Sequence, residues 1–127
     1  MTPTIRILLI EDDSGHARLI QEMVKDACGA SCVFERSARL ADGLSAGLVS
    51  GPNIILLDLS LPDCFGVETL ERVISTLPNV PVLVLSSNDD AQVADKMRQA
   101  GARGYLVKGQ FDSDVLARAI RSALQVP

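Results

Sequence analysis

Runs of hydrophobic residues alternate with amphipathic segments along the whole chain. Five short runs are predicted to be strands. The first, third and fourth are almost uninterrupted Ile, Leu and Val, which is typical of strands covered on both faces. The second run, "CVFE", is shorter and more polar, as suits an edge strand. The predicted strands are residues 5–10, 32–35, 54–58, 82–86 and 104–107.

Between these runs, apolar residues recur at the three- and four-residue spacing of amphipathic helices. Residues suited to the ends of the five predicted helices are Ser14, Gly29, Ser37, Pro78, Gly101 and Asp112. Ser37 and Asp112 are expected N-caps, whereas Gly29 and Gly101 suit helix C-termini. Strands that alternate with helices imply right-handed crossovers and a parallel, doubly wound α/β sheet.

Length and charge narrow the class of protein. A chain of 127 residues, 47% of them hydrophobic, predicts one globular domain that spans residues 1–127. The net charge is −4 and no cluster of Lys and Arg occurs, so direct binding to nucleic acid is not expected. The longest uncharged stretch, residues 43–57, is interrupted by Gly and Pro and cannot supply the roughly 20 apolar residues of a membrane helix. The N-terminus does not resemble a signal peptide.

The three cysteines, Cys28, Cys32 and Cys64, contain no CxxC pair. They are interpreted as small thiols of a reducing cytoplasm. With a single histidine, His16, in the chain, a zinc site is not expected, and His16 itself is interpreted as a surface residue.

Polar residues stand where four of the predicted strands end. The first strand is followed by Glu11, Asp12 and an adjacent acid, and the third strand ends at Asp58. The fourth ends at Ser86 and the fifth is followed by Lys108. In a parallel sheet these ends share one edge, and with strand order 2-1-3-4-5 the ligand-binding switch point falls between strands one and three. Glu11, Asp12 and Asp58 are therefore expected to be neighbours.

Three adjacent carboxylates cannot all stay ionised unaided, because two charges 4 Å apart repel by about 4 kcal/mol at an effective dielectric constant near 20. Either some are protonated or a cation lies among them, and oxygen ligands favour Mg²⁺. A carboxylate of Asp58 can attack phosphorus to give an aspartyl phosphate. The Lys108 ammonium and the Ser86 hydroxyl can stabilise phosphoryl oxygens. Each residue alone has an ordinary structural explanation. An acid pair, Asp, Ser and Lys at the ends of the first, third, fourth and fifth strands, in that order, form a much more specific pattern than any one of them.

Four segments, "LLIEDD", "IILLDLSLPDCFG", "VLVLSS" and "GYLVKG", together resemble a response-regulator receiver domain of bacterial two-component signalling, of the CheY-like superfamily. The resemblance covers essentially the whole chain. It implies a flavodoxin-like (βα)₅ fold. It also implies Mg²⁺-dependent phosphorylation of Asp58 by a histidine kinase or a phosphotransfer protein.

The resemblance also implies roles for the residues around Asp58. Glu11 and Asp12 are the acids of the metal site, with Asp12 and Asp58 expected as direct ligands and the backbone carbonyl of Ser60 as a further one. Asp13 is an outer-shell candidate.

The signal is expected to leave through a conformational switch. Ser86 is the hydroxyl switch residue, Tyr105 the switch aromatic, and Lys108 contacts the phosphoryl group. The face of the fourth helix, fifth strand and fifth helix would then control an effector protein or a covalently linked output domain, and this face also allows a homodimer. The chain would catalyse only its own phosphorylation and dephosphorylation.

Two positions depart from the family pattern. Gly109 follows Lys108 where receivers commonly have proline with a cis peptide bond, so a cis bond is not expected here. Ser87 stands where the family often has alanine or glycine.

Two alternative functions stay open at the level of sequence. Phosphatases of the haloacid-dehalogenase type also use a strand-end Asp with Mg²⁺, but they typically carry a second Asp two residues further on, where this chain has Ser60. The other alternative is a protein-binding module of the same fold that does not use phosphate. Whether the chain is a stand-alone protein or part of a longer one is also open.

Overall fold

The structure is a computed structural model that describes residues 4–28 and 31–125, and the predicted cap Gly29 lies outside them. The elements follow in the order β1 (Ile5–Ile10), α1 (Ser14–Cys28), β2 (Cys32–Ser37), α2 (Leu40–Ser50), β3 (Ile54–Asp58), β4 (Ser60–Leu61), β5 (Cys64–Phe65), α3 (Val67–Thr76), β6 (Val82–Ser86), α4 (Ala91–Gln99), β7 (Gly104–Val107) and α5 (Ser113–Leu124). Within the described ranges, no helix is long and apolar enough to cross a membrane.

Five of the strands form one parallel sheet in the order β2-β1-β3-β6-β7. This is the predicted order 2-1-3-4-5, with β6 and β7 as the fourth and fifth strands. The bounds predicted for β1, β3, β6 and β7 are confirmed. The second strand is two residues longer than predicted because β2 pairs with β1 along its whole length, from Ile5 opposite Cys32 to Ile10 opposite Ser37.

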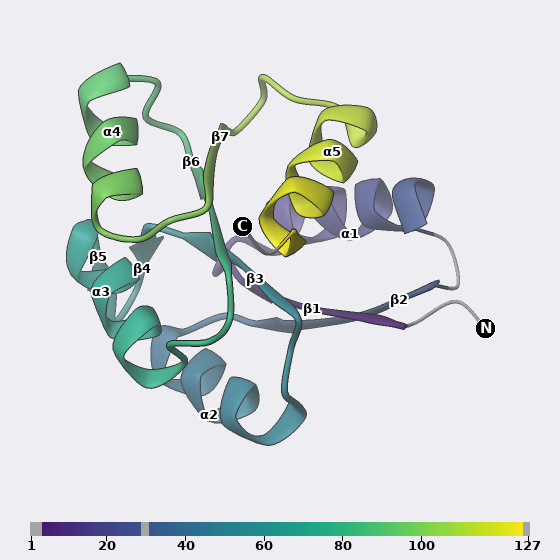
Figure 1. The fold of residues 1–127 in the computed structure, drawn as a ribbon, viewed down its shortest axis with the longest axis horizontal. Coiled ribbons are helices and arrows are strands. Elements are labelled where there is room, and N and C mark those ends of the chain that lie inside the picture. The colour runs from purple at the N-terminus through teal and green to yellow at the C-terminus, as the bar shows by residue number, and fades with distance from the viewer. Residues whose placement is uncertain (1–3, 29–30, 126–127) are drawn as a thin grey trace.

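Helices cover both faces of the sheet (Figure 1). The sheet therefore divides the core into two layers. One face packs against α1 and α5, with residues such as Ile20 and Leu116 fully buried. The other face packs against α2, α3 and α4, with Leu40, Leu70 and Met97 among the buried side chains. Every residue of β3 and β6 is buried. This two-sided burial explains why their sequences are uninterrupted aliphatic runs up to the polar residue that ends each strand.

The start of α2 differs from the prediction. Ser37 ends β2, and the N-cap of α2 is Arg39, whose side chain makes no capping hydrogen bond. The Asp63 carboxylate takes this role from the turn between β4 and β5, accepting hydrogen bonds from the backbone N–H groups of Leu40 (2.8 Å) and Ala41 (3.0 Å). The two-stranded β4–β5 hairpin that carries Asp63 was not predicted. The predicted cap at the start of α5 is confirmed by the Asp112 side chain.

The interpretation of the cysteines as three thiols is wrong for two of them. Cys28 at the end of α1 and Cys32 at the start of β2 form a disulfide. The Cα atoms of the two cysteines lie 5.6 Å apart, which is within the range that a disulfide spans. Cys64 is free and half-buried.

Candidate functional site

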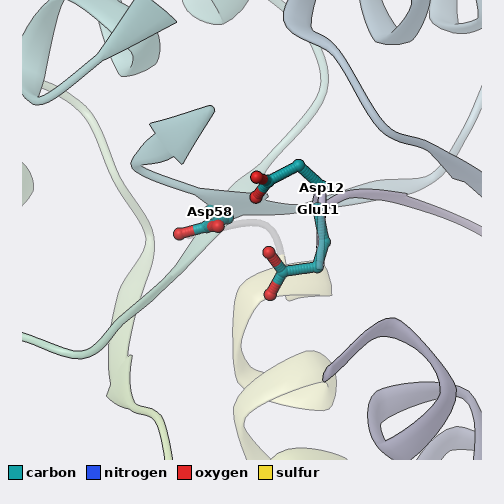
Figure 2. A group of neighbouring side chains, drawn as sticks. All are labelled: Glu11, Asp12 and Asp58. Carbon is teal, nitrogen blue, oxygen red and sulfur yellow. The ribbon is translucent and has the colours of Figure 1, made fainter. Parts of the chain in front are cut away.

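The acids at the ends of β1 and β3 come together as predicted. The two strands pair with Ile10 opposite Leu57, so Glu11 and Asp58 follow at the same level of the sheet. The carboxylates of Glu11, Asp12 and Asp58 each place an oxygen within 4.8 Å of the others, at the carboxyl ends of these two strands (Figure 2). Glu11 is fully buried and Asp58 is 4% exposed, whereas Asp12 is exposed. The cluster is therefore buried at Glu11 and Asp58 and open to solvent at Asp12.

Lys108 reaches this cluster from the end of β7. Its Nζ lies 2.7 Å from Oε1 of Glu11 and 3.3 Å from Oδ2 of Asp58. The backbone N–H of Lys108 donates to the carbonyl of Ser86 at 2.8 Å, which holds the start of its loop against the end of β6. One ammonium group against three carboxylates leaves an excess of negative charge in a largely buried place, which is costly unless a cation or a proton offsets it.

The electrostatics of the site follow from this burial. Burial first, and then the neighbouring Asp58, raise the pKa of Glu11 from its usual 4.5 to about 7, against the lowering effect of Lys108. Burial alone would lower the pKa of Lys108, but its hydrogen bond to Glu11 and the negative charges of Asp58 and Glu11 outweigh burial, so its pKa is raised. Lys108 therefore stays charged at neutral pH, and Glu11 is the group most easily protonated.

The donor set fits Mg²⁺. All three side chains offer carboxylate oxygens, the ligands that Mg²⁺ prefers. Mg²⁺ usually keeps several waters, which the exposed side at Asp12 admits. The oxygens of Asp58 are already oriented, because the backbone N–H of Ser60 donates to Oδ1 at 3.2 Å while Lys108 contacts Oδ2.

Asp13, the outer-shell candidate, has another structural role. Its Oδ1 accepts a hydrogen bond from the backbone N–H of His16 at 3.0 Å, at the first turn of α1. These backbone hydrogen bonds, from His16 first and then from Gly15, lower the pKa of the exposed Asp13 carboxyl. Its backbone N–H donates to Oε2 of Glu11 at 3.4 Å, so Asp13 also links the start of α1 to the cluster.

The two predicted switch residues meet at the backbone of Asn88. Ser86 is buried, and its Oγ accepts a hydrogen bond from the N–H of Asn88 at 3.1 Å. The hydroxyl of Tyr105 donates to the carbonyl oxygen of the same residue at 2.6 Å. Tyr105 is half-buried and packs against the core layer under α4. The sequence placed Ser86 and Tyr105 on separate strands and did not predict that one backbone segment joins them.

The loop after Lys108 has its own geometry. Gly109 adopts φ 82°, and no cis peptide bond occurs in the described part of the chain. Proline, which is fixed near φ −65°, cannot adopt this conformation. The glycine in place of the family's proline therefore sets the path of the loop that carries Lys108.

Sequence reasoning missed the contacts of Arg36. In β2 this residue pairs opposite Leu9, and its side chain extends to the turn after β1. Its Nε donates to the carbonyl oxygen of Glu11 and its Nη2 to that of Asp12, both at 3.0 Å. A charged residue near the end of an edge strand carries no local signal for such contacts. Only the pairing of β2 with β1 reveals them.

Comparisons with known proteins identify the family. The model of the response regulator receiver domain matches residues 7–121, so the chain belongs to this family. The transcriptional regulatory protein DegU of Brevibacillus brevis is 36% identical over 124 residues, covering 95% of this chain and 50% of DegU. The cell cycle transcriptional regulator CtrA of Caulobacter vibrioides is 32% identical over 114 residues, covering 90% of this chain and 48% of CtrA. The chain thus spans about half the length of these relatives.

A solved structure shows the same fold. The signal receiver domain of a putative Luxo repressor protein from Vibrio parahaemolyticus superposes with a TM-score of 0.84 at 26% identity, covering 95% of this chain and 90% of that one. The chain is a signalling receiver domain with an acidic cluster at the carboxyl edge of its sheet. The family match does not favour the phosphatase alternative or the module that does not use phosphate.

Proposed function

We propose that Asp58 accepts a phosphoryl group from a histidine kinase or a phosphotransfer protein in an Mg²⁺-dependent reaction. The observation that carries this proposal is the position of Lys108, whose ammonium lies against both buried carboxylates, 3.3 Å from Asp58. An ammonium held there neutralises charge that develops on a phosphoryl group bound at Asp58.

The transfer exchanges one bond to phosphorus for another. A carboxylate oxygen of Asp58 forms a bond to phosphorus while the bond from phosphorus to the donor imidazole nitrogen breaks, and the imidazole keeps that electron pair. Lys108 stabilises one phosphoryl oxygen. The Oγ of Ser86 already accepts a hydrogen bond from Asn88, so its O–H is free to donate to another phosphoryl oxygen.

Asp12 and Asp58, assisted by Glu11 and the backbone carbonyl of Ser60, would hold the metal ion. When bound, Mg²⁺ supplies positive charge to the transferring phosphoryl oxygens. Glu11 serves mainly to orient and charge-balance Lys108, because their atoms are the closest ion pair of the site at 2.7 Å.

The output of the domain would pass through Ser86 and Tyr105. A phosphoryl group that draws the Ser86 hydroxyl inward changes the hydrogen bond from Asn88, and Tyr105 bonds to that same residue. The change then reaches the face of α4, β7 and α5, which would contact an effector protein, a linked output domain or a second copy of the chain. We further propose a single domain over residues 1–127, a cytoplasmic location, and catalysis limited to its own phosphorylation and dephosphorylation.

Beryllofluoride, a mimic of an aspartyl phosphate, tests this proposal. ¹⁹F NMR of the protein with BeF₃⁻ and Mg²⁺ should show one stable bound species that is absent without Mg²⁺ and absent in the Asp58→Asn variant. Continued turnover of a small phosphoryl donor would indicate a phosphatase instead. A wild-type protein that forms no bound species under any Mg²⁺ concentration would indicate a phosphate-independent module and overturn the proposal.

A further inference from the structure

Arg36 links the edge strand to the turn that carries the metal-site acids. Its guanidinium donates to two successive backbone carbonyls, those of Glu11 and Asp12, both at 3.0 Å. The N–H of Glu11 in turn donates to the carbonyl of Ser37 at 2.9 Å. The backbone at Glu11 is therefore held to β2 from both sides, by strand pairing and by the Arg36 side chain.

This arrangement uses the shape of the arginine side chain. A guanidinium is planar and carries several donors in a fixed geometry, so one side chain can hold two adjacent carbonyls. A lysine at the same place has a single ammonium on a flexible stem. The two carbonyls belong to the residues whose carboxylates form the cluster with Asp58, so fixing these peptide groups limits where the carboxylates of Glu11 and Asp12 lie.

We propose that Arg36 is a positioning residue for the metal site, holding the Glu11–Asp12 turn so that its carboxylates face Asp58. The inference rests on the proposed function, since the cluster is taken to bind Mg²⁺. Arg36 itself is exposed and contacts the turn only through backbone atoms. Its replacement therefore removes no carboxylate of the cluster and no buried side chain of the core.

The sign of the effect separates this role from a simple charge effect. Arg36 is a positive charge near a cation site, and removing a positive charge on its own strengthens the binding of Mg²⁺. Removing a group that orients the ligands weakens it, by about tenfold for typical outer-shell partners of metal ligands. The two explanations predict opposite shifts in the dissociation constant.

The experiment is a titration of ¹⁵N-labelled protein with Mg²⁺ at constant ionic strength, followed by NMR. The variants are Arg36→Ala, Arg36→Gln and Arg36→Lys. The matched control is Arg18→Ala, which removes a positive charge from the same groove between α1 and β2. We expect about tenfold weaker binding in the Ala and Gln variants, an intermediate value for Lys, and an unchanged or slightly tighter value for the Arg18 control. Arg36 variants that bind Mg²⁺ as tightly as the Arg18 control, or more tightly, would overturn the proposal.

Amide hydrogen exchange provides a second readout that needs no metal. In Mg²⁺-free protein, the hydrogen-bonded amides of Glu11 and Asp13 should exchange several-fold faster in Arg36→Ala than in the wild type, while the amides of β3 stay unchanged. Unchanged exchange at Glu11 and Asp13 would refute the positioning role even if the wild-type protein bound no Mg²⁺. Failure of wild-type Mg²⁺ binding and of the BeF₃⁻ adduct, with faster exchange in Arg36→Ala, would instead count against the proposed function alone.

Discussion

The buried acid Glu11 makes the stability of the metal-free protein depend on pH. Its side chain is 1% exposed, and burial raises its pKa from 4.5 to about 7. A raised folded-state pKa means that the contribution of Glu11 to stability is fully present below about pH 4.5 and is lost as the pH rises through about 7. The loss amounts to roughly 3 kcal/mol, at about 1.4 kcal/mol for each tenfold change in equilibrium.

The Glu11→Gln variant isolates this effect. It keeps the shape of the side chain but cannot ionise. The unfolding free energy of the variant minus that of the wild type should therefore increase by about 1–3 kcal/mol from pH 5 to pH 8. The ion pair with Lys108 is already part of this estimate, because Lys108 lowers the pKa of Glu11 and so reduces the gain. Chelator-treated protein unfolded in urea at several pH values, followed by circular dichroism, measures the difference.

Groups shared by the two proteins cancel in this comparison. A difference in unfolding free energy between Glu11→Gln and the wild type that stays constant from pH 5 to pH 8 would refute the account of Glu11. The same proton also competes with the metal, since ligands must be deprotonated to bind. The Mg²⁺ dissociation constant of the wild type should therefore rise as the pH falls below about 7, by up to about tenfold for each pH unit.

Three further predictions concern neighbouring features. Asp63→Ala removes the carboxylate that accepts two backbone hydrogen bonds of α2, so urea unfolding at pH 7 should show a loss of about 1 kcal/mol. Those backbone hydrogen bonds lower the pKa of Asp63, so the loss persists above about pH 4 and shrinks in more acidic solution; a loss independent of pH down to pH 2 would contradict this role. Gly109→Ala places a side chain at φ 82° with open space around it, and thermal unfolding should show a destabilisation of roughly 1 kcal/mol from the backbone alone, whereas an unchanged melting temperature would contradict it. Tyr105→Phe removes the hydrogen bond to Asn88 and should cost up to about 1 kcal/mol in unfolding free energy while leaving BeF₃⁻ binding at Asp58 intact; a lost adduct would place Tyr105 in the phosphoryl site itself.

The main features of the fold and the site could be predicted because they depend on local patterns. The aliphatic runs of β3 and β6 are buried on both faces, so each ends where the first polar residue, Asp58 or Ser86, appears. The parallel sheet then brings strand ends from distant parts of the chain to one edge. This is why the proximity of Glu11, Asp12 and Asp58 follows from strand order. Lys108 was predicted at the same edge, and its contact with Glu11 and Asp58 is seen in the structure.

What the sequence did not reveal depends on contacts between residues far apart in the chain. Ser37 was expected to cap α2 because it is adjacent, but the capping carboxylate of Asp63 comes from a turn more than twenty residues later. The hydrogen bonds of Arg36 likewise join β2 to the turn after β1. The disulfide of Cys28 and Cys32 depends on how close the end of α1 lies to the start of β2, which no cysteine motif indicates.

The central claim is that phosphoryl transfer ends on one carboxylate, and its position can be read by mass spectrometry. Protein treated with phosphoramidate and Mg²⁺ is reduced with borohydride, which converts an acyl phosphate to an alcohol and marks its site. Transfer to Asp58 predicts a single marked residue at position 58, with no mark in Asp58→Asn and none when Mg²⁺ is chelated. A mark at Glu11, Asp12 or Asp13 in place of Asp58, or an Asp58→Asn variant marked as fully as the wild type, would contradict it.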